Sequence, residues 1–176
     1  MKVLVAYATR HGATRGIAER VGQTLEGRGL DVTVAPASQA RDIKQYDAFV
    51  VGGAAYAFRW LKDATQFVRQ NGDYLAQHPT WLFSSGPLGD KIDKRTGKDA
   101  REGTIPREFE QFTRDIKPRD ERVFFGAWDP AAPPIGLMEQ FMKLMPGAGA
   151  LPSGDFRDWA DIDGWATQIA DELTAG

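Results

Sequence analysis

The sequence of 176 residues has no cysteine and only two histidines, His11 and His78. Without cysteine, disulfides, cysteine-bound zinc, iron–sulfur clusters and thiol catalysis are excluded. Two histidines are too few for a multi-histidine metal site, so we predict no metal. An excess of one charge is also missing, because 22 Lys and Arg residues are balanced by 24 Asp and Glu residues. The net charge of −2 argues against a generally basic protein that binds nucleic acid by neutralising phosphates.

Long hydrophobic runs are missing as well. The longest uncharged, largely apolar run covers residues 48–58, and its 11 residues are too few to cross a bilayer. The N-terminal apolar stretch ends by Ala8 and Arg10 follows, which is not the pattern of a signal peptide. We therefore expect a cytoplasmic protein, and peripheral contact with the inner face of the membrane stays open.

The segments that are present alternate between two patterns. Short apolar runs of the kind found in buried parallel strands occupy residues 2–7, 31–35, 46–51, 80–84 and 122–127. Helical patterns begin at residue 14, cover residues 61–75, begin again at residue 104, and return at Asp158 or Asp161 for the terminal helix. This alternation predicts βαβ units in a three-layer α/β/α sandwich around a doubly wound, five-stranded parallel sheet. We expect a single domain over residues 1–176, with a late insertion at about residues 128–157.

In a sheet of this kind, ligands bind beyond the carboxyl ends of the strands, where three loops carry informative residues. The first loop has Gly12 for a sharp turn, hydroxyls on Thr9 and Thr14, and the start of a helix, a combination that suits one phosphate group. Arg10 adds positive charge there or is solvated, and His11 either donates to the phosphate or caps the loop. The alternative interpretation is an ordinary turn between a strand and a helix, with threonine caps.

The second and third loops suit a flat ligand. In the second, Gly52 and Gly53 permit close approach of a planar group, and Tyr56, Phe58 and Trp60 offer aromatic faces, unless these rings belong to the core. In the third, residues 83–89 offer N–H and hydroxyl groups to the polar edge of a ring, unless they form a simple turn.

The first loop carries a family resemblance. Thr9, Gly12 and Thr14 form a Thr-x-x-Gly-x-Thr pattern after the N-terminal strand, which resembles the phosphate loop of the flavodoxins. That loop usually reads (Ser/Thr)-x-Thr-Gly-x-Thr, so His11 replaces one hydroxyl residue. The form Thr-Arg-x-Gly-x-Thr is more similar to the flavodoxin-like menaquinone-dependent protoporphyrinogen IX dehydrogenases. A late Met-containing insertion and Asp158-Trp159 before the last helix extend the resemblance over nearly the whole chain.

The resemblance implies a flavodoxin-like fold with strand order 2-1-3-4-5 and bound FMN. It implies a flavin-dependent oxidoreductase that passes electrons from a reduced organic substrate, such as a tetrapyrrole, to a quinone such as menaquinone. No catalytic side chain is assigned, because the redox chemistry belongs to the cofactor. The cofactor contacts that it implies are Thr9, Arg10, His11, Gly12, Ala13, Thr14, Ala54, Ala55, Tyr56, Ala57, Phe58, Ser84, Ser85, Gly86, Pro87, Leu88 and Gly89.

Other functions stay open. The chain is alternatively a flavodoxin-type electron carrier that docks to proteins, a flavodoxin-like protein with a deazaflavin, or a scaffold without a ligand. A carrier usually has a strongly acidic docking face, for which Asp155, Asp158, Asp161 and Asp163 are the candidates.

Two segments have no assigned role. Residues 90–101 carry mixed charge and are either a solvated loop or a site for substrate carboxylates or anionic lipid. Met138, Met142 and Met145 in the insertion either pack on the core or form a wall for a quinone, a tetrapyrrole or a membrane surface. Residues 128–134 lack the basic, aromatic-rich character expected of the dehydrogenase, which leaves the substrate open.

Overall fold

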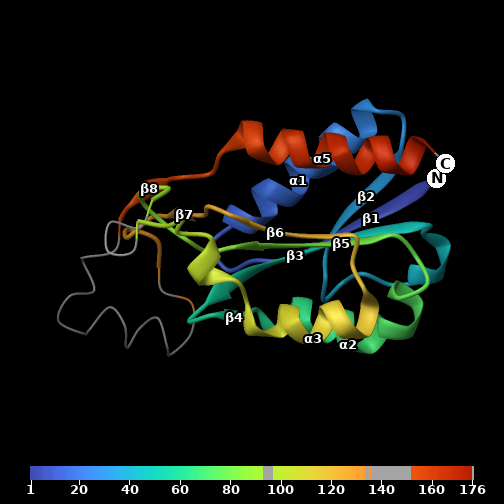
Figure 1. Ribbon diagram of the computed structural model, residues 1–176, viewed down its shortest axis with the longest axis horizontal. Coiled ribbons are helices and arrows are strands. Elements are labelled where there is room, and N and C mark those ends of the chain that lie inside the picture. Colours follow the sequence, from blue (N-terminus) through green and yellow to red (C-terminus); the bar gives the residue numbers. More distant parts are fainter. Residues whose placement is uncertain (93–96, 134, 136–151, 176) are drawn as a thin grey trace.

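The computed structural model describes residues 1–92, 97–133, 135 and 152–175 (Figure 1). The main sheet consists of β1 (Lys2–Ala8), β2 (Asp31–Pro36), β3 (Ala48–Tyr56), β5 (Thr80–Ser85) and β6 (Asp120–Phe124). These strands pair in parallel in the order β2-β1-β3-β5-β6. Because β4 is only a short hairpin strand, this is the predicted order 2-1-3-4-5, and the predicted fold class is confirmed.

The helices cover the two faces of the sheet in pairs (Figure 1). α1 (Ala13–Gly27) and α5 (Trp159–Thr174) lie on one face, and α2 (Lys62–Leu75) and α3 (Arg107–Ile116) lie on the other. Two short 3₁₀ turns, η1 (Ile43–Gln45) and η2 (Glu102–Thr104), belong to the connections. Both chain termini lie at the end of the molecule opposite the β4 hairpin.

The predicted apolar faces form two separate cores. One core lies between the sheet and α1 and α5, and the second lies between the sheet and α2 and α3. Burial of apolar area on both sides explains why the central strands are almost continuously hydrophobic. The predicted helix residues that are buried here are Ile17, Val21, Leu25, Ala64, Val68, Leu75, Phe109, Phe112, Ile116, Ile162, Trp165, Ile169 and Leu173.

Several predicted element boundaries were wrong. The strand predicted at residues 46–51 is β3, which starts two residues later and continues to Tyr56, because Gly52 and Gly53 still pair with β1 and β5. The strand predicted at 122–127 ends at Phe124, and the helix predicted from residue 104 begins at Arg107. The start near Asp158 is confirmed, since the Asp158 side chain caps α5 by accepting from the Asp161 N–H.

Three short strands were not predicted. β4 (Arg59–Trp60) folds back on β3, and β7 (Ala127–Trp128) pairs in antiparallel fashion with β8 (Gly154–Asp155). The three methionines of the insertion lie outside the described residues. In the described part of the chain, no helix is both long enough and apolar enough to cross a membrane.

Candidate functional site

The first loop has the geometry of an anion site at the start of α1. Gly12 adopts a left-handed conformation with φ of +86°, and its N–H donates to Thr9 Oγ1 at 3.0 Å. The first helical bond is from the Gly16 N–H to the Gly12 carbonyl, at 3.0 Å. The preceding N–H groups of the first turn have no acceptor within the helix. Because that turn has no acidic residue and no side-chain cap, it favours a bound anion.

The Thr14 hydroxyl has a partner inside the protein. Its side chain is fully buried, and its Oγ1 lies 2.8 Å from the Oγ of Ser85, the last residue of β5. Thr9 Oγ1 accepts a bond from Gly12 but keeps its own proton to donate.

The two large side chains of this loop each contact an aromatic ring from another loop. The guanidinium carbon of Arg10 lies 4.7 Å from the centroid of the Tyr56 ring. The ring of His11 meets the ring of Trp128 edge to face, with centroids 5.5 Å apart. Trp128 was not predicted as a site residue, because strand β7 brings it to the loop only through tertiary folding.

The second loop is a hairpin. β3 runs to Tyr56, and β4 returns antiparallel to it after a turn at Ala57 and Phe58. Both turn residues have positive φ, 48° and 63°, a conformation usually taken by Asn-Gly pairs in such hairpins. The Phe58 carbonyl accepts from the Arg107 N–H at 3.0 Å, and the Phe58 side chain is 49% exposed. The strained turn therefore holds one aromatic ring out at the carboxyl end of the sheet.

The expectation that Gly52, Gly53 and Trp60 face a ligand was wrong. A Cβ added at Gly52 would run into the ring of Phe83, and a Cβ added at Gly53 would lie 2.7 Å from Trp60 Nε1. Trp60 is 4% exposed and donates from Nε1 to the Gly53 carbonyl at 2.9 Å. The two glycines make room for aromatic side chains of the two cores.

The third loop lies directly against the second. A Cβ added at Gly86 would be 3.5 Å from the Cβ of Ala55, so the loops touch at their bases. A ring held between them would therefore lie at the level of their tips, at residues 56–58 and 87–89. Ser84 is fully buried, and its Oγ has no hydrogen-bond partner in the described part of the protein.

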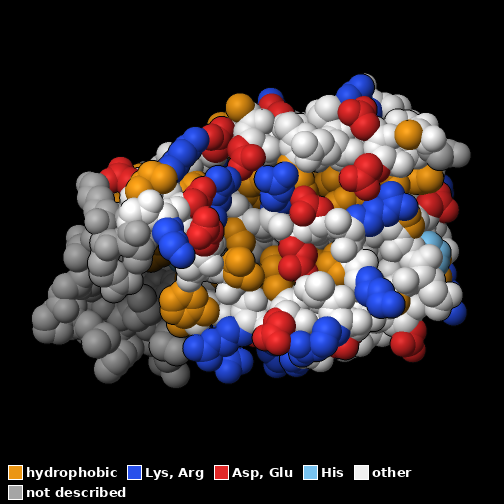
Figure 2. Space-filling view, viewed as in Figure 1, with side chains coloured by type: hydrophobic (Ala, Val, Ile, Leu, Met, Phe, Trp, Pro, Cys, Tyr) orange, Lys and Arg blue, Asp and Glu red, His pale blue; other side chains and the backbone are white. Residues whose placement is uncertain are grey.

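Oppositely charged side chains neutralise one another near these loops. Each of the four aspartates of the predicted acidic face forms an ion pair: Asp155 with Arg157, Asp158 with Lys91, Asp161 with Arg101 and Asp163 with Arg20. Hydrogen bonds from these partners lower the pKa of Asp155, Asp158 and Asp163 below the usual range. Figure 2 shows acidic and basic side chains interspersed over the visible face.

The mixed-charge segment is partly used inside the protein. Arg101 binds Asp99 at 2.6 Å as well as Asp161, and its guanidinium carbon lies 5.8 Å from the ring centroid of Phe125. Its neighbours Lys94 and Arg95 lie outside the described residues. At least two basic residues of this segment, Lys91 and Arg101, therefore hold the start of α5 in place.

Arg157 is a candidate site residue that sequence reasoning missed. Its Nη1 donates to the Ala13 carbonyl at 3.3 Å, and its guanidinium occupies the space that a side chain at Gly16 would fill. The side chain is only 17% exposed and also pairs with Asp155 at 2.6 Å, so it connects the segment before α5 to the first turn of α1. Nothing in the sequence pattern indicates this contact across more than 140 positions.

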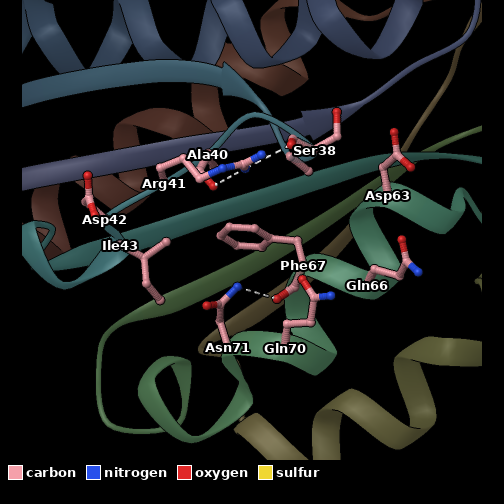
Figure 3. Close-up of a pocket in the computed structure, with 11 residues that line it drawn as sticks. Ser38, Ala40, Arg41, Asp42, Ile43, Asp63, Gln66, Phe67, Gln70 and Asn71 are labelled. Carbon is pink, nitrogen blue, oxygen red and sulfur yellow. Dashed lines mark hydrogen bonds between the residues drawn. The ribbon is translucent and has the colours of Figure 1, made fainter.

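Two hollows lie away from the three loops. The larger, about 440 Å³, lies between α2 and the segment after β2, where Ser38 and Arg41 face Gln66 and Gln70 across an apolar floor that includes Phe67 (Figure 3). The smaller, about 290 Å³, lies beside β6. Neither hollow is lined by a predicted cofactor residue.

Comparison with known proteins identifies the family. The model of the flavodoxin domain family matches residues 4–142. The chain belongs to the flavodoxin domain family. Flavodoxins bind FMN, so the family supports the predicted cofactor. The first turn of α1 has no acidic residue, and its first N–H groups have no acceptor within the helix, so it fits the phosphate of that cofactor.

Individual relatives agree with the family. The chain is 28% identical over 98 residues to protoporphyrinogen IX dehydrogenase [quinone] of Escherichia coli K12, and the match covers 54% of each protein. The chain therefore spans about half the length of this curated relative. Among solved structures, an archaeal flavodoxin matches with a TM-score of 0.60 at 16% identity, and a Pseudomonas aeruginosa flavodoxin with 0.61 at 14%. Both matches cover 99% of each chain and show the shared fold.

Proposed function

We propose that this flavodoxin-family protein is an FMN-dependent oxidoreductase that takes electrons from a reduced organic substrate and passes them to a quinone. The observation that carries the proposal is the first turn of α1, where an uncapped helix start meets a glycine turn. When bound, FMN supplies the electron transfer, and the protein supplies binding, orientation and exclusion of water.

The chain's own residues divide the work. We propose that the start of α1, at Ala13 and Thr14 after the Gly12 turn, holds the phosphate together with Thr9, Arg10 and His11. Residues 54–58 and 84–89 then hold the flat ring between the tips of the two loops, at residues 56–58 and 87–89. The guanidinium of Arg10 lies over the ring of Tyr56, so the phosphate loop contacts the hairpin.

The charge distribution favours an enzyme over an electron carrier. A carrier that docks through an acidic face needs uncompensated carboxylates, and Asp155, Asp158, Asp161 and Asp163 are each in an ion pair. The tetrapyrrole substrate and the menaquinone acceptor are proposed from the relative in Escherichia coli. The alternatives are an electron carrier and a flavodoxin-like protein with a deazaflavin cofactor. We include peripheral contact with a membrane in the proposal because a quinone resides there.

The first experiment is a binding and turnover assay on the full chain. We expect purified protein reconstituted with FMN to be yellow and to bleach on reduction, and to oxidise protoporphyrinogen when menaquinone is supplied. Binding of a deazaflavin in preference to FMN would mean that the proposed cofactor is wrong. Rapid single-electron exchange with a reductase, without turnover of protoporphyrinogen, would favour the carrier.

A pair of glycine variants tests the phosphate loop. Gly12 and Gly29 both have φ of +86° and both have open space around an added Cβ, but only Gly12 lies in the predicted site. Alanine at either position should lower the free energy of unfolding by about 1–2 kcal/mol, because an L side chain is strained there. Gly12→Ala should also raise the dissociation constant for FMN, measured by flavin fluorescence, while Gly29→Ala should not. Equal FMN affinity in the two variants would remove the loop from the site.

A further inference from the structure

An arginine of the first loop lies over a tyrosine ring of the second. Arg10 comes two residues after Ala8, the last residue of β1, and Tyr56 is the last residue of β3. Because β1 and β3 pair side by side as far as Ala8 and Gly53, the two side chains leave the sheet close together. The guanidinium carbon of Arg10 is 4.7 Å from the centroid of the Tyr56 ring, within the range of a cation–π contact.

The position of the Tyr56 ring is set by the hairpin. Tyr56 pairs with Arg59 in the antiparallel β3–β4 ladder. The turn between them is held by the Phe58 carbonyl, which accepts from the Arg107 N–H at 3.0 Å. Arg10 and Tyr56 are both partly buried, which strengthens the attraction between a cation and a ring. The ring is therefore a fixed platform on which a long side chain loses part of its rotamer freedom.

A guanidinium that lies over a ring keeps its capacity to bind an anion. The ring contacts one face of the group, whereas the five N–H donors lie in the plane of the group and point away from its edge. A phosphate binds two of these donors in a bidentate contact. Because the ring orders Arg10 before a ligand arrives, it lowers the entropy cost of that contact and so raises the affinity for phosphate.

We propose that Tyr56 is a positioning residue that holds the Arg10 guanidinium in place for the phosphate of the cofactor. This inference rests on the proposed function, which places Arg10 at the phosphate. The positioning role differs from a ring contact in one measurable way, because the benefit of Tyr56 passes through Arg10 and is lost when the ligand has no phosphate. A contact between Tyr56 and the flavin ring would act on both kinds of ligand alike.

A double-mutant cycle on the full chain isolates this coupling. Arg10→Met, Tyr56→Leu and the double variant are titrated with FMN and with riboflavin, which lacks the phosphate, and binding is followed by flavin fluorescence. Each single change should raise the dissociation constant for FMN, and the double variant should raise it by less than the product of the two factors. We expect this shortfall to be about twofold to fivefold, the equivalent of one cation–π contact. With riboflavin, the two factors should multiply without a shortfall.

Two control variants accompany the cycle. Tyr56→Phe keeps the aromatic face and should recover most of the FMN affinity that Tyr56→Leu loses. Arg119 lies 5.3 Å from the Trp81 ring centroid, just before β6 and therefore at the amino ends of the strands. Arg119→Met removes a positive charge from a similar contact away from the site and should leave the FMN dissociation constant unchanged. If Tyr56→Leu does not fold, Tyr56→Val takes its place, because β-branched residues suit a strand.

The other outcomes overturn the positioning role. A shortfall of equal size with riboflavin would mean that the pair acts on the ring or on the fold. Factors that multiply with FMN as well would mean that Arg10 and Tyr56 act separately. An equal loss of FMN affinity in Arg119→Met would assign the effect of Arg10 to the overall charge of the protein. Failure of the wild-type protein to bind FMN is a different result, which contradicts the proposed function itself.

Discussion

Substitution of Gly52 by alanine tests which molecule fills the space beside this glycine, a ligand or the protein. Gly52 lies within β3, and an added Cβ would overlap the ring of Phe83 on β5, with even Cε2 only 2.5 Å away. The ring has nowhere to move, because it is fully buried and packs against Phe124 and Trp165 with centroids 6.0 Å apart in both cases. The substitution therefore adds volume to a closed core.

The size of the effect follows from that packing. Overpacking a well-filled core usually lowers the free energy of unfolding by about 1–3 kcal/mol. Because three ring atoms of Phe83 lie within 2.5 Å of the new Cβ, we expect the upper end, about 3 kcal/mol. Complete displacement of the ring sets a ceiling of about 3–5 kcal/mol. For a chain of this size, 3 kcal/mol corresponds to a fall in Tm of roughly 6–12 °C.

The assay is urea denaturation of the protein without added flavin, with a second glycine as control. Gly164 lies inside α5 with open space around it, so Gly164→Ala should raise the free energy of unfolding by about 0.5–1 kcal/mol. Adding Phe83→Leu to Gly52→Ala should recover part of the loss, since the smaller side chain vacates the overlap. A change below about 0.5 kcal/mol in Gly52→Ala would refute the reasoning, since ordinary surface substitutions fall in that range.

Two further predictions concern pH. Burial raises the pKa of Glu121, whose carboxylate accepts from Thr113 at 2.7 Å. Ionisation of Glu121 therefore opposes folding as the pH rises above the ordinary glutamate pKa of about 4.3. Glu121→Gln should therefore be more stable than the wild type at neutral pH, and urea titrations should show the advantage vanishing in acid. Asp163 has a lowered pKa because Arg20 donates to it at 2.6 Å. Its ionised carboxylate therefore stabilises the fold above about pH 3.9, and this stabilisation is lost as the pH falls through its lower pKa in the folded protein. Asp163→Asn should lose stability at neutral pH and flatten the acid limb of the same titration, and an unchanged limb would contradict this.

The order of strands and helices was predictable because local patterns carry it. The apolar run that became β1 and the stripe of Ile17, Val21 and Leu25 on α1 are visible in the sequence and are buried as expected. Handedness and short connections then leave few topologies for alternating strands and helices. The exact ends of β3 were not predictable, since Gly52 and Gly53 look like turn residues until Phe83 and Trp60 are placed beside them.

The meeting of the three loops was predictable from the sequence, but the direction of their side chains was not. Parallel strands bring their carboxyl ends to one edge, so the three loops had to meet there. The partner of a hydroxyl is decided by residues distant in the chain, and that of Thr14 is Ser85. In the same way, the apparent acidic face disappears once Lys91 and Arg20 are seen to pair with its carboxylates.

By itself, the sequence determined the layers of the fold, the edge of the sheet where the three loops meet and the glycine turn before α1, because each depends on residues close together in the chain. The tertiary structure alone decided that Trp60 packs in the core, that Trp128 and Arg157 reach the phosphate loop, and that Ser85 holds Thr14. Those contacts join segments up to 144 positions apart, and such pairs form only when strands and helices have packed around a common core.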